Sequence, residues 1–387
     1  MIKNSISLLI ISAIHFSLFA QDPIQVEGVI VDASNETLPY TAVGILSKYI
    51  GTVSNDDGAF ILKLDESNLN DTLSFSTMGY KTFKIRIQDY LDSKKEVVIL
   101  EEDFFLLNDI EIKNPITIVK EALKKLKETT YKKPHQLNIL YRRFSNENNI
   151  SRFLVEHFIK VLDAGPTSST FSFIEIAQAR MSNDYRFAKK KQTFHAVNMI
   201  AKQNPLRNGI SLNKFKWKII DDSSYDGEDV IIIEGKEKKN TSKWIRLYIG
   251  DDTKSIYKLE KSDLNAVYIY KKNKDGKMVL SYHNREYVFW EDVTPYMKKL
   301  LKLKENKIKL SYRHEAIVLG IGFERKKIKV IDNISQGTDM GDYDVVYKPD
   351  FWKNLNLPPD SKFYKTSSEQ LESLYGIPIE TQFKRVK

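Results

Sequence analysis

The stretch from Gly51 to Leu62 reads GTVSNDDGAFIL and sets an amide, two carboxylates and a glycine in a row. Such oxygens can hold calcium, form a catalytic pair or shape a turn. A helix-loop-helix calcium site needs oxygen ligands at positions 1 and 12 of its loop and glycine at position 6. With Gly58 at position 6, the two ligand positions fall on Val53 and Leu64, whose side chains have no oxygen.

We therefore interpret Asn55, Asp56, Asp57 and Gly58 as a hairpin turn between two strands. Asparagine and aspartate tolerate left-handed backbone, and glycine adopts it at no steric cost. A catalytic carboxylate pair is the alternative. Adjacent carboxylates in a tight turn normally point into water, so the sequence predicts a turn here, with neither metal nor chemistry.

A second candidate is His283 with Glu286, an HxxE like that of the zinc ligands in carboxypeptidases. The surrounding MVLSYHNREYVFW reads as a strand, and residues three apart on a strand point to opposite faces. One zinc ion cannot take both, and a zinc site needs a closed ligand set. We interpret the pair as a surface histidine and glutamate on a hairpin.

Other reactive motifs are missing from the sequence. There is no GxSxG, and GIGFER at 320–325 lacks the third glycine of a dinucleotide fingerprint. The absence of cysteine excludes disulfides, thiolate metal sites and thiol nucleophiles. Four further histidines follow no metal-ligand spacing: His135, His157, His195 and His314. We predict no catalytic residue, no metal ligand and no cofactor. Because scattered side chains can converge in a fold, an enzyme stays an alternative.

The first twenty residues predict a secretory signal. Lys3 supplies a positive start, residues 5–14 are mostly apolar, and Ala20 offers a small residue at the cut. A membrane-spanning helix needs about 20 apolar residues, and His15 and the serines interrupt a shorter run. No later stretch is long and apolar enough to span a bilayer. We expect an exported chain that is soluble or peripheral.

Residues 22–101 predict a first domain. Short β-rich runs recur at intervals of about ten residues, which favours a β-sandwich of seven short strands. Six of the runs are IQVEGVIVD, TAVGILSK, GAFILKL, DTLSFST, YKTFKIRI and KEVVIL. This part carries 7 basic and 13 acidic side chains, whereas residues 102–387 carry 52 and 38. An acidic module followed by a basic one indicates two domains, and export makes nucleic acid an improbable partner for the basic one.

The first domain resembles the carboxypeptidase-regulatory-like domain, a prealbumin-like sandwich at the start of many exported proteins of Bacteroidetes-type bacteria. The stretches GVIVDASNETLPYTAVGI, GTVSNDDGAFIL and LSFSTMGYKT carry the resemblance. Its residues are Gly28, Asp32, Leu38, Pro39, Ala42, Gly51, Thr52, Asp57, Gly58, Phe60, Leu73, Gly79 and Tyr80. The resemblance implies a non-catalytic accessory module, in agreement with the lack of a reactive set of side chains in 24–101.

Residues 102–114 predict a linker, and 115–387 predict an α+β domain. Asn114 can cap a helix that begins at Pro115, with one apolar stripe formed by Ile116, Val119, Ala122, Leu123 and Leu126. Long alternating runs follow, with Asp275-Gly276 as a hairpin turn and a helix in FHAVNMIAKQNP. The predicted fold class is mainly β: the seven-strand sandwich plus a long, curved antiparallel sheet packed on helices.

The second region loosely resembles the sheet region that follows the same accessory domain in other envelope proteins. It is also similar to the half-barrel of periplasmic lipoprotein carriers. Pieces such as YDGEDVIIIEGKE, WIRLYIGDDTKSIYKLE and YKPDFWKNLNLPP carry this resemblance. No ligand-binding residue is carried over from it. The long strands themselves predict a curved sheet that wraps a helix and leaves a concave face for binding.

The stretch 294–310, TPYMKKLLKLKENKIKL, is the strongest charge cluster. Thr294 can cap a helix that Pro295 opens, with Met297, Leu300 and Leu301 at helical spacing. A basic amphipathic helix can lie on anionic lipid. The more common outcome is a helix packed on its own sheet with solvated lysines, and that is the structure we predict.

Together these observations favour a non-catalytic, exported envelope protein, periplasmic or associated with the outer membrane. An accessory sandwich precedes a domain that binds a lipid-like, glycan or protein partner, with peripheral membrane contact through 294–310. The alternative is a hydrolase of envelope polymer, with carboxylates from distant strands. A third reading, a fragment of an outer-membrane receptor, fits poorly. Only about 286 residues follow the sandwich, and the chain ends in FKRVK, without a terminal aromatic residue.

Overall fold

The computed structural model describes most of the chain beyond the predicted signal. The described residues are 23–48, 50–103, 114–166, 168–188, 195–332, 334–335 and 337–384. The predicted signal at 1–20 and most of the predicted linker lie outside them. Within these residues, no helix combines the length and the apolar character that a bilayer crossing requires.

The N-terminal region is a β-sandwich of two small sheets, with seven strands as predicted. The first sheet has the order β4 (Ala59–Leu64), β1 (Ile24–Val31), β7 (Val97–Ile99). The second has the order β3 (Ile50–Val53), β2 (Ala42–Ile45), β5 (Thr72–Ser76), β6 (Phe83–Arg86). Alternate side chains of β4, namely Phe60, Leu62 and Leu64, lie in the core between the sheets. The run YKTFKIRI is strand only to Arg86, because the short helix α2 (Ile87–Asp92) follows directly.

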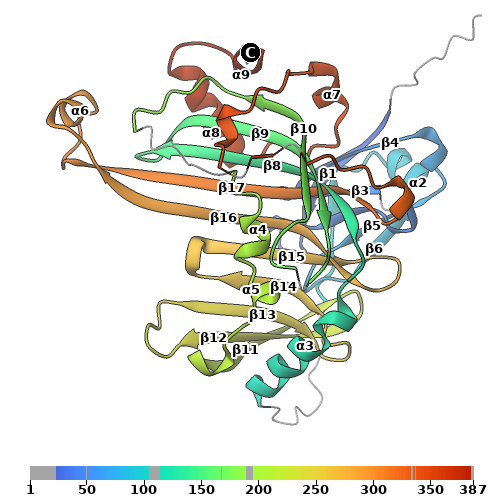
Figure 1. Ribbon diagram of the computed structural model, residues 1–387. Coiled ribbons are helices and arrows are strands. Elements are labelled where there is room, and N and C mark those ends of the chain that lie inside the picture. The colour runs from blue at the N-terminus through green and yellow to red at the C-terminus, as the bar shows by residue number, and fades with distance from the viewer. Residues whose placement is uncertain are drawn as a thin grey trace, which may run out of the picture.

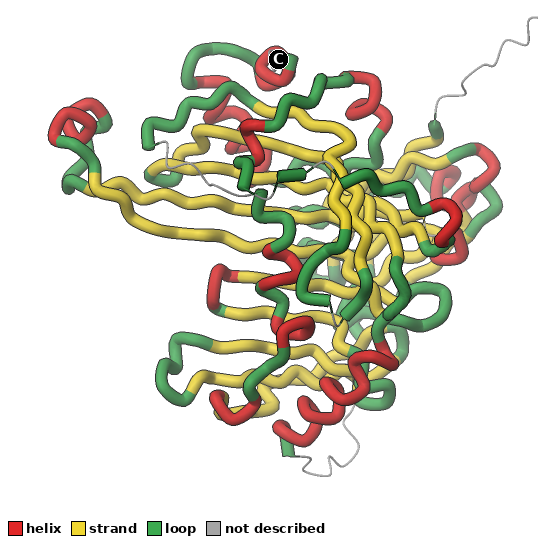
Figure 2. The backbone as a smooth tube through the Cα atoms, in the orientation of Figure 1, coloured by secondary structure: helices red, strands yellow, loops and turns green. Residues whose placement is uncertain are grey.

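The second region is built on one antiparallel sheet of ten strands (Figures 1 and 2). In spatial order the strands are β10 (Phe173–Met181), β9 (Ile150–Asp163), β8 (His135–Glu147), β17 (Lys307–Gly322), β16 (Met278–Asp292), β15 (Ala266–Lys272), β14 (Ile256–Lys261), β13 (Trp244–Gly250), β12 (Glu228–Glu237) and β11 (Phe215–Tyr225). Two meanders, β8–β10 and β11–β17, are joined where β17 pairs with β8. The predicted fold class is confirmed.

Short helices cover one face of this sheet. Helix α3 (Pro115–Thr129) is capped by the Asn114 side chain, which accepts from the backbone N–H of Ile116 at 3.2 Å. Its buried residues are Ile118, Val119, Ala122 and Leu126, so Ile118 joins the predicted stripe and Ile116 lies at its margin. Among the described residues of the predicted helix FHAVNMIAKQNP, Met199–Lys202 form the short helix α4, and the last residue of the stretch begins a separate helix, α5 (Pro205–Asn208).

The opposite face carries the sandwich and the C-terminal helices. These helices are α7 (Pro349–Asn354), α8 (Lys362–Ser373) and α9 (Ile379–Phe383). One apolar cluster joins Val53 of the sandwich to Tyr282 and Ile317 of the sheet and to Trp352 of α7. The central strands are therefore buried on both faces, which explains their long apolar runs.

The Asn55–Gly58 turn has the predicted local geometry. Gly58 has a φ of 75°, and Asn55 Oδ1 accepts from the backbone N–H groups of Asp57 at 2.8 Å and Ala59 at 3.0 Å. The prediction of a hairpin was wrong, because the turn connects β3 and β4, which belong to different sheets.

The expectation that the acidic side chains point into water was also wrong. The Asp56 carboxylate lies 3.0 Å from the Arg313 guanidinium of β17 and accepts from the Tyr40 hydroxyl. Asn55 Nδ2 donates to the Pro359 carbonyl at 3.0 Å, and Asp57 accepts from the backbone N–H of Lys362. The turn thus attaches the sandwich to the second region.

We expect Asp56→Asn to destabilise the protein, whereas an exposed turn carboxylate would be neutral. The ion pair with Arg313 is partly exposed, so its loss and the weaker bond to Tyr40 cost about 1–2 kcal/mol. Thermal unfolding of the whole protein measures the effect. The control is Asp275→Asn in the exposed turn Asn273–Gly276, which has the same Asx geometry. Equal melting temperatures for both variants would show that the turn does not hold the two regions together.

The stretch 294–310 also differs from its prediction. Helix α6 (Pro295–Leu300) is capped by Thr294 as expected, since Oγ1 accepts from the backbone N–H of Met297 at 3.2 Å. It does not pack on the sheet. It lies at the outer end of the long β16–β17 hairpin, which projects from the body of the protein (Figure 1).

Candidate functional site

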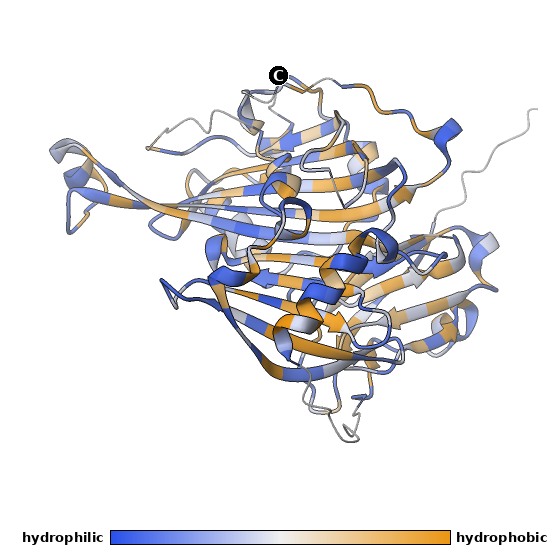
Figure 3. Cartoon of the chain, turned by 60° about the horizontal axis from the view of Figure 1, so that its bottom comes forward, coloured by the Kyte–Doolittle hydropathy of each residue, from blue (hydrophilic) through white to orange (hydrophobic). Residues whose placement is uncertain are grey.

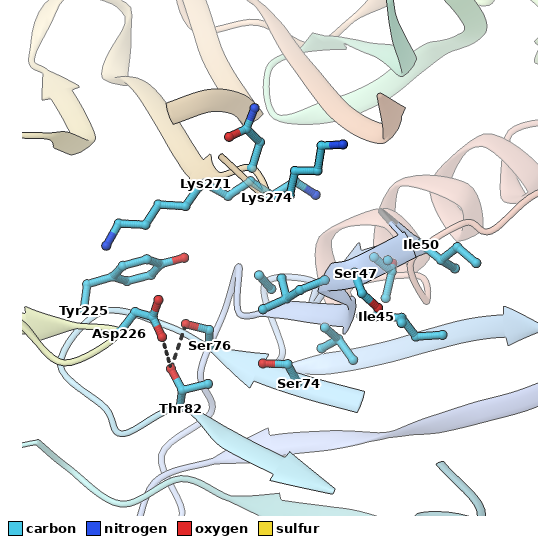
Figure 4. A pocket seen from close by; sticks show the side chains of 18 of the residues that line it. Ile45, Ser47, Ile50, Ser74, Ser76, Thr82, Tyr225, Asp226, Lys271 and Lys274 are labelled. Atoms are coloured by element: carbon cyan, nitrogen blue, oxygen red, sulfur yellow. Dashed lines mark hydrogen bonds between the residues drawn. The ribbon is translucent and has the colours of Figure 1, made fainter. Parts of the chain in front are cut away.

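A cleft of about 420 Å³ lies between the sandwich and the ten-stranded sheet (Figure 4). Strands β2, β3 and β5 form its floor. The β11–β12 turn, with Tyr225 and Asp226, forms one wall, and the β15–β16 turn, from Lys271 to Gly276, forms the opposite side. Its volume lies within the ~300–1,000 Å³ that is usual for small-molecule sites.

Small side chains keep the floor of the cleft open. Gly44 and Gly51 lie directly opposite each other on β2 and β3. A Cβ atom on Gly44 would come within 2.3 Å of the Ile50 carbonyl oxygen, so no larger residue fits that backbone. Ser74 and Ser76 of β5 continue the surface. The Gly51-Thr52 pair noted in the sequence is therefore part of the cleft as well as of the fold.

Lys271 is the unusual charge in the cleft. Its side chain is half-buried and reaches toward Tyr225 (Figure 4). No described carboxylate lies within ion-pair distance of its ammonium group, and desolvation lowers its pKa. A partly desolvated charge without a partner is unfavourable, so this ammonium favours an anion brought by a ligand.

Two of the neighbouring lysines are paired, and a third, Lys274 of the cleft lining, is exposed to solvent. Lys272 Nζ lies 3.6 Å from the Glu228 carboxylate and above the ring of Tyr257. Lys258 pairs with Glu260 at 2.6 Å. The one carboxylate of the cleft lining, Asp226, accepts from the Thr82 hydroxyl at 3.3 Å. Lys271 is thus the lining lysine whose charge is both desolvated and unmatched.

A second cavity of about 360 Å³ adjoins the first and shares Ala42, Ser76, Tyr225 and Lys271 with it. Further tyrosines line it: Tyr40, Tyr80, Tyr248, Tyr257 and Tyr270. Burial, with the Glu260 carboxylate nearby, raises the pKa of Tyr248 to about 12, and its neutral hydroxyl donates to that carboxylate at 3.1 Å. The two cavities adjoin at these shared residues, and their linings include apolar, aromatic and cationic side chains.

A separate cluster of buried polar side chains lies on the other face of the sheet, beneath α4. The Tyr141 hydroxyl lies 2.9 Å from His314 Nδ1 and accepts from Arg285 Nη2 at 3.0 Å. His157 Nδ1 lies 2.8 Å from His195 Nε2. His283 belongs to the same face and is directly opposite Tyr268, with the two rings stacked at 4.2 Å. Four histidines that are far apart in sequence therefore meet in one region.

Burial keeps these four imidazoles neutral. It lowers the pKa of His157 to about 3, with the nearby Arg143 guanidinium as a second cause. Burial first, and neighbouring cations second, hold the pKa values of His283 and His314 well below 6.5. Burial and the adjacent His157 do the same for His195. In the described part of the chain, no group of three or more histidine, aspartate or glutamate side chains has an arrangement that could hold a metal ion.

His283 and Glu286 lie on β16 and face opposite sides of the sheet, as the sequence predicted. The interpretation of His283 as a surface residue was wrong, because it is fully buried and its Nδ1 lies 2.9 Å from the Val267 carbonyl. Gly320 and Gly322 of GIGFER belong to β17 and not to a phosphate-binding loop. His135 is buried apart from the other histidines, with Nδ1 2.9 Å from the Lys133 carbonyl.

Sequence reasoning missed Lys271 and Tyr225 as candidate site residues. A signal was present, since KKNKDGK places four lysines around a predicted turn. Nothing in the sequence shows that the sandwich packs over this turn and desolvates one of the four lysines, Lys271.

Comparisons with known proteins find one family match and a number of distant solved structures. No curated protein matches the sequence. A DUF1329 family protein from Desulfovibrio piger has 12% identity and a TM-score of 0.24, over 58% of this chain and 96% of its own. A putative outer membrane lipoprotein-sorting protein domain from Vibrio parahaemolyticus has 10% identity and a TM-score of 0.22, over 56% of this chain and 94% of its own. A LolA superfamily protein from Nitrosomonas europaea has 14% identity and a TM-score of 0.20, over 51% of this chain and 92% of its own. Residues 26–112 match the family model of the CarboxypepD_reg-like domain, the family that the opening motifs resemble.

Proposed function

We propose that the protein is an exported, non-catalytic binding protein of the cell envelope. In this proposal the cleft between the sandwich and the sheet binds an anionic amphiphile, such as a fatty acid. The division into a signal at 1–20, a sandwich at 22–101, a linker at 102–114 and a binding domain at 115–387 belongs to the same proposal. So does peripheral contact with a membrane through 294–310.

The observation that carries the proposal is the unmatched Lys271 ammonium in a cleft that is apolar at its other end. Figure 4 shows Lys271, Tyr225 and Asp226 on one side, and Ile45 and Ile50 on the other. An amphiphile with one acidic group and an apolar chain matches this arrangement in charge and polarity. A neutral ligand would leave Lys271 desolvated and unpaired.

The composition of the lining also favours binding over hydrolysis of an envelope polymer. Glycoside hydrolysis uses two carboxyl groups on either side of the scissile bond. Asp226 is the one carboxylate among the residues that line the two cavities. It accepts a hydrogen bond from Thr82.

We expect Lys271→Gln to weaken binding of a dansyl-labelled undecanoic acid by about 10–100-fold. A hydrogen bond to a charged group contributes about 1.5–3 kcal/mol, and each 1.4 kcal/mol is a factor of ten in affinity. Titration of the dansyl fluorescence measures the affinity. The methyl ester of the same probe should bind both forms of the protein equally, because it carries no charge.

The matched control is Lys218→Gln on the exposed edge strand β11, which makes the same change in net charge away from the cleft. Equal affinities of the acid for wild type and Lys271→Gln would show that the ammonium does not face the ligand. Failure of the wild-type protein to bind the acid at micromolar concentrations would contradict the proposal.

A further inference from the structure

The outer part of the β16–β17 hairpin is a projecting arm, which we define as residues 287–309. Pairing of β15 with β16 ends at Asn284, and pairing of β8 with β17 ends at Leu310. Beyond these points the strand ladder joins β16 and β17 only, through Asp292 and Lys307, and the Lys309 backbone bonds to Asn148 at the base of the arm. The arm therefore extends past the rest of the sheet and ends in α6 (Figure 1).

Large apolar side chains on the arm are exposed to solvent. The exposed fractions are 48% for Val288, 63% for Trp290, 73% for Tyr296 and 52% for Leu300. Val288 and Trp290 alternate along β16 and so share one face of the arm. Exposed hydrophobic groups gathered on a projecting element mark an interaction surface. Figure 3 shows hydrophobic and hydrophilic residues close together on this arm.

The same arm is basic. It contains six lysines and three acidic residues, a net charge of +3. The lysines are Lys298, Lys299, Lys302, Lys304, Lys307 and Lys309. None of them lies within ion-pair distance of a carboxylate in the described residues, and Lys309 instead donates to the Asn149 side chain at 3.1 Å. This positive charge is thus available to an external partner.

We propose that the arm docks on a membrane that contains anionic phospholipid, with its aromatic and aliphatic side chains at the level of the headgroups. Tryptophan and tyrosine favour the membrane–water interface. Lysines close to the membrane surface are attracted to anionic lipid. Lysine is depleted in protein–protein interfaces, so the six lysines favour lipid over a protein partner. The inference rests on the proposed place of the protein in the envelope and is independent of the cleft.

Co-sedimentation with vesicles tests the docking. The purified protein should bind vesicles of phosphatidylcholine with 30% phosphatidylglycerol, and should bind pure phosphatidylcholine far more weakly. The triple variant Lys298→Gln, Lys299→Gln, Lys302→Gln should bind the anionic vesicles about 100-fold less tightly, since each lysine near the surface contributes roughly fivefold. The control triple variant Lys216→Gln, Lys218→Gln, Lys239→Gln removes the same charge from the far edge of the sheet and should bind like wild type.

Tryptophan fluorescence gives a second readout. Anionic vesicles should shift the emission of wild type to shorter wavelength, and Trp290→Phe should abolish most of that shift. Equal binding to neutral and anionic vesicles, or equal losses in the two triple variants, would overturn the proposal. Absence of binding to every vesicle would assign the arm to a protein partner instead. The probe titration of the cleft contains no vesicles, so its outcome is separate from all of these.

Discussion

Lowering the pH from about 7.5 to 5.5 is expected to remove about 6 kcal/mol from the free energy of unfolding. The cause is the cluster of His157, His195, His283 and His314, which is neutral in the folded protein because burial lowers all four pKa values. In the unfolded chain the same imidazoles titrate near pH 6.5. A loss of this size is comparable to the total stability of many domains.

The direction follows from proton binding. When a folded-state pKa lies below the unfolded value, the unfolded chain binds more protons at acidic pH. Stability is complete above about pH 7 and falls as the pH drops through 6.5. One pH unit below that value, each histidine costs about 1.4 kcal/mol. Burial and the Arg142 and Arg180 guanidinium groups act in opposite directions on Glu156, whose pKa is lowered overall. Protonation of Glu156 therefore reduces the free energy of unfolding only in a more acidic range, below about pH 4.5.

Urea unfolding at pH 8.0, 6.5 and 5.5 measures this loss. The pH slope of the unfolding free energy below pH 6 should correspond to uptake of about four protons by this cluster, and His135, whose pKa burial also lowers, adds to it. His283→Gln should reduce that slope by one proton, and His195→Gln should do the same. A slope below one proton in the wild-type protein would show that the imidazoles are not kept neutral by the fold.

The second large effect is expected from Gly58→Val, at about 2–5 kcal/mol. Gly58 has a φ of 75°, which a β-branched residue resists. A Cβ atom there would also lie 2.5 Å from the Ile30 carbonyl oxygen, so the backbone of β1 would have to move. Strain from the left-handed conformation costs about 1–2 kcal/mol, and overpacking adds about 1–3 kcal/mol.

The chain provides a matched control in Gly276→Val. Gly276 has a φ of 70° and ends an Asx turn of the same form, with Asn273 in the place of Asn55. No heavy atom would lie within 4 Å of its added Cβ. Its cost should be limited to about 1–2 kcal/mol. If the two variants have the same denaturant midpoint, the contact with Ile30 contributes nothing to the cost of Gly58→Val.

Local features of this fold follow from the sequence, because they depend on neighbours in the chain. The Asn55–Gly58 turn, the Asn114 cap and the alternation of β16 each need only a few consecutive residues. The partners of Asp56 could not be predicted, since Arg313 is 257 positions away and meets it only once the sandwich docks. The histidine cluster has the same origin, because the central strands bring its members together only when β17 pairs with β8.

Assembly order follows from that same pairing of β17 with β8. The β8–β10 meander leaves one edge of β8 unpaired until Lys307–Gly322 arrives, more than 150 residues later in the chain. Contacts between such distant segments close a long loop and slow folding. During synthesis the meander therefore has an unpaired, apolar strand edge, which is a template for wrong pairing. A chain that is kept unfolded until the residues of β17 have been synthesised would avoid that period of exposure.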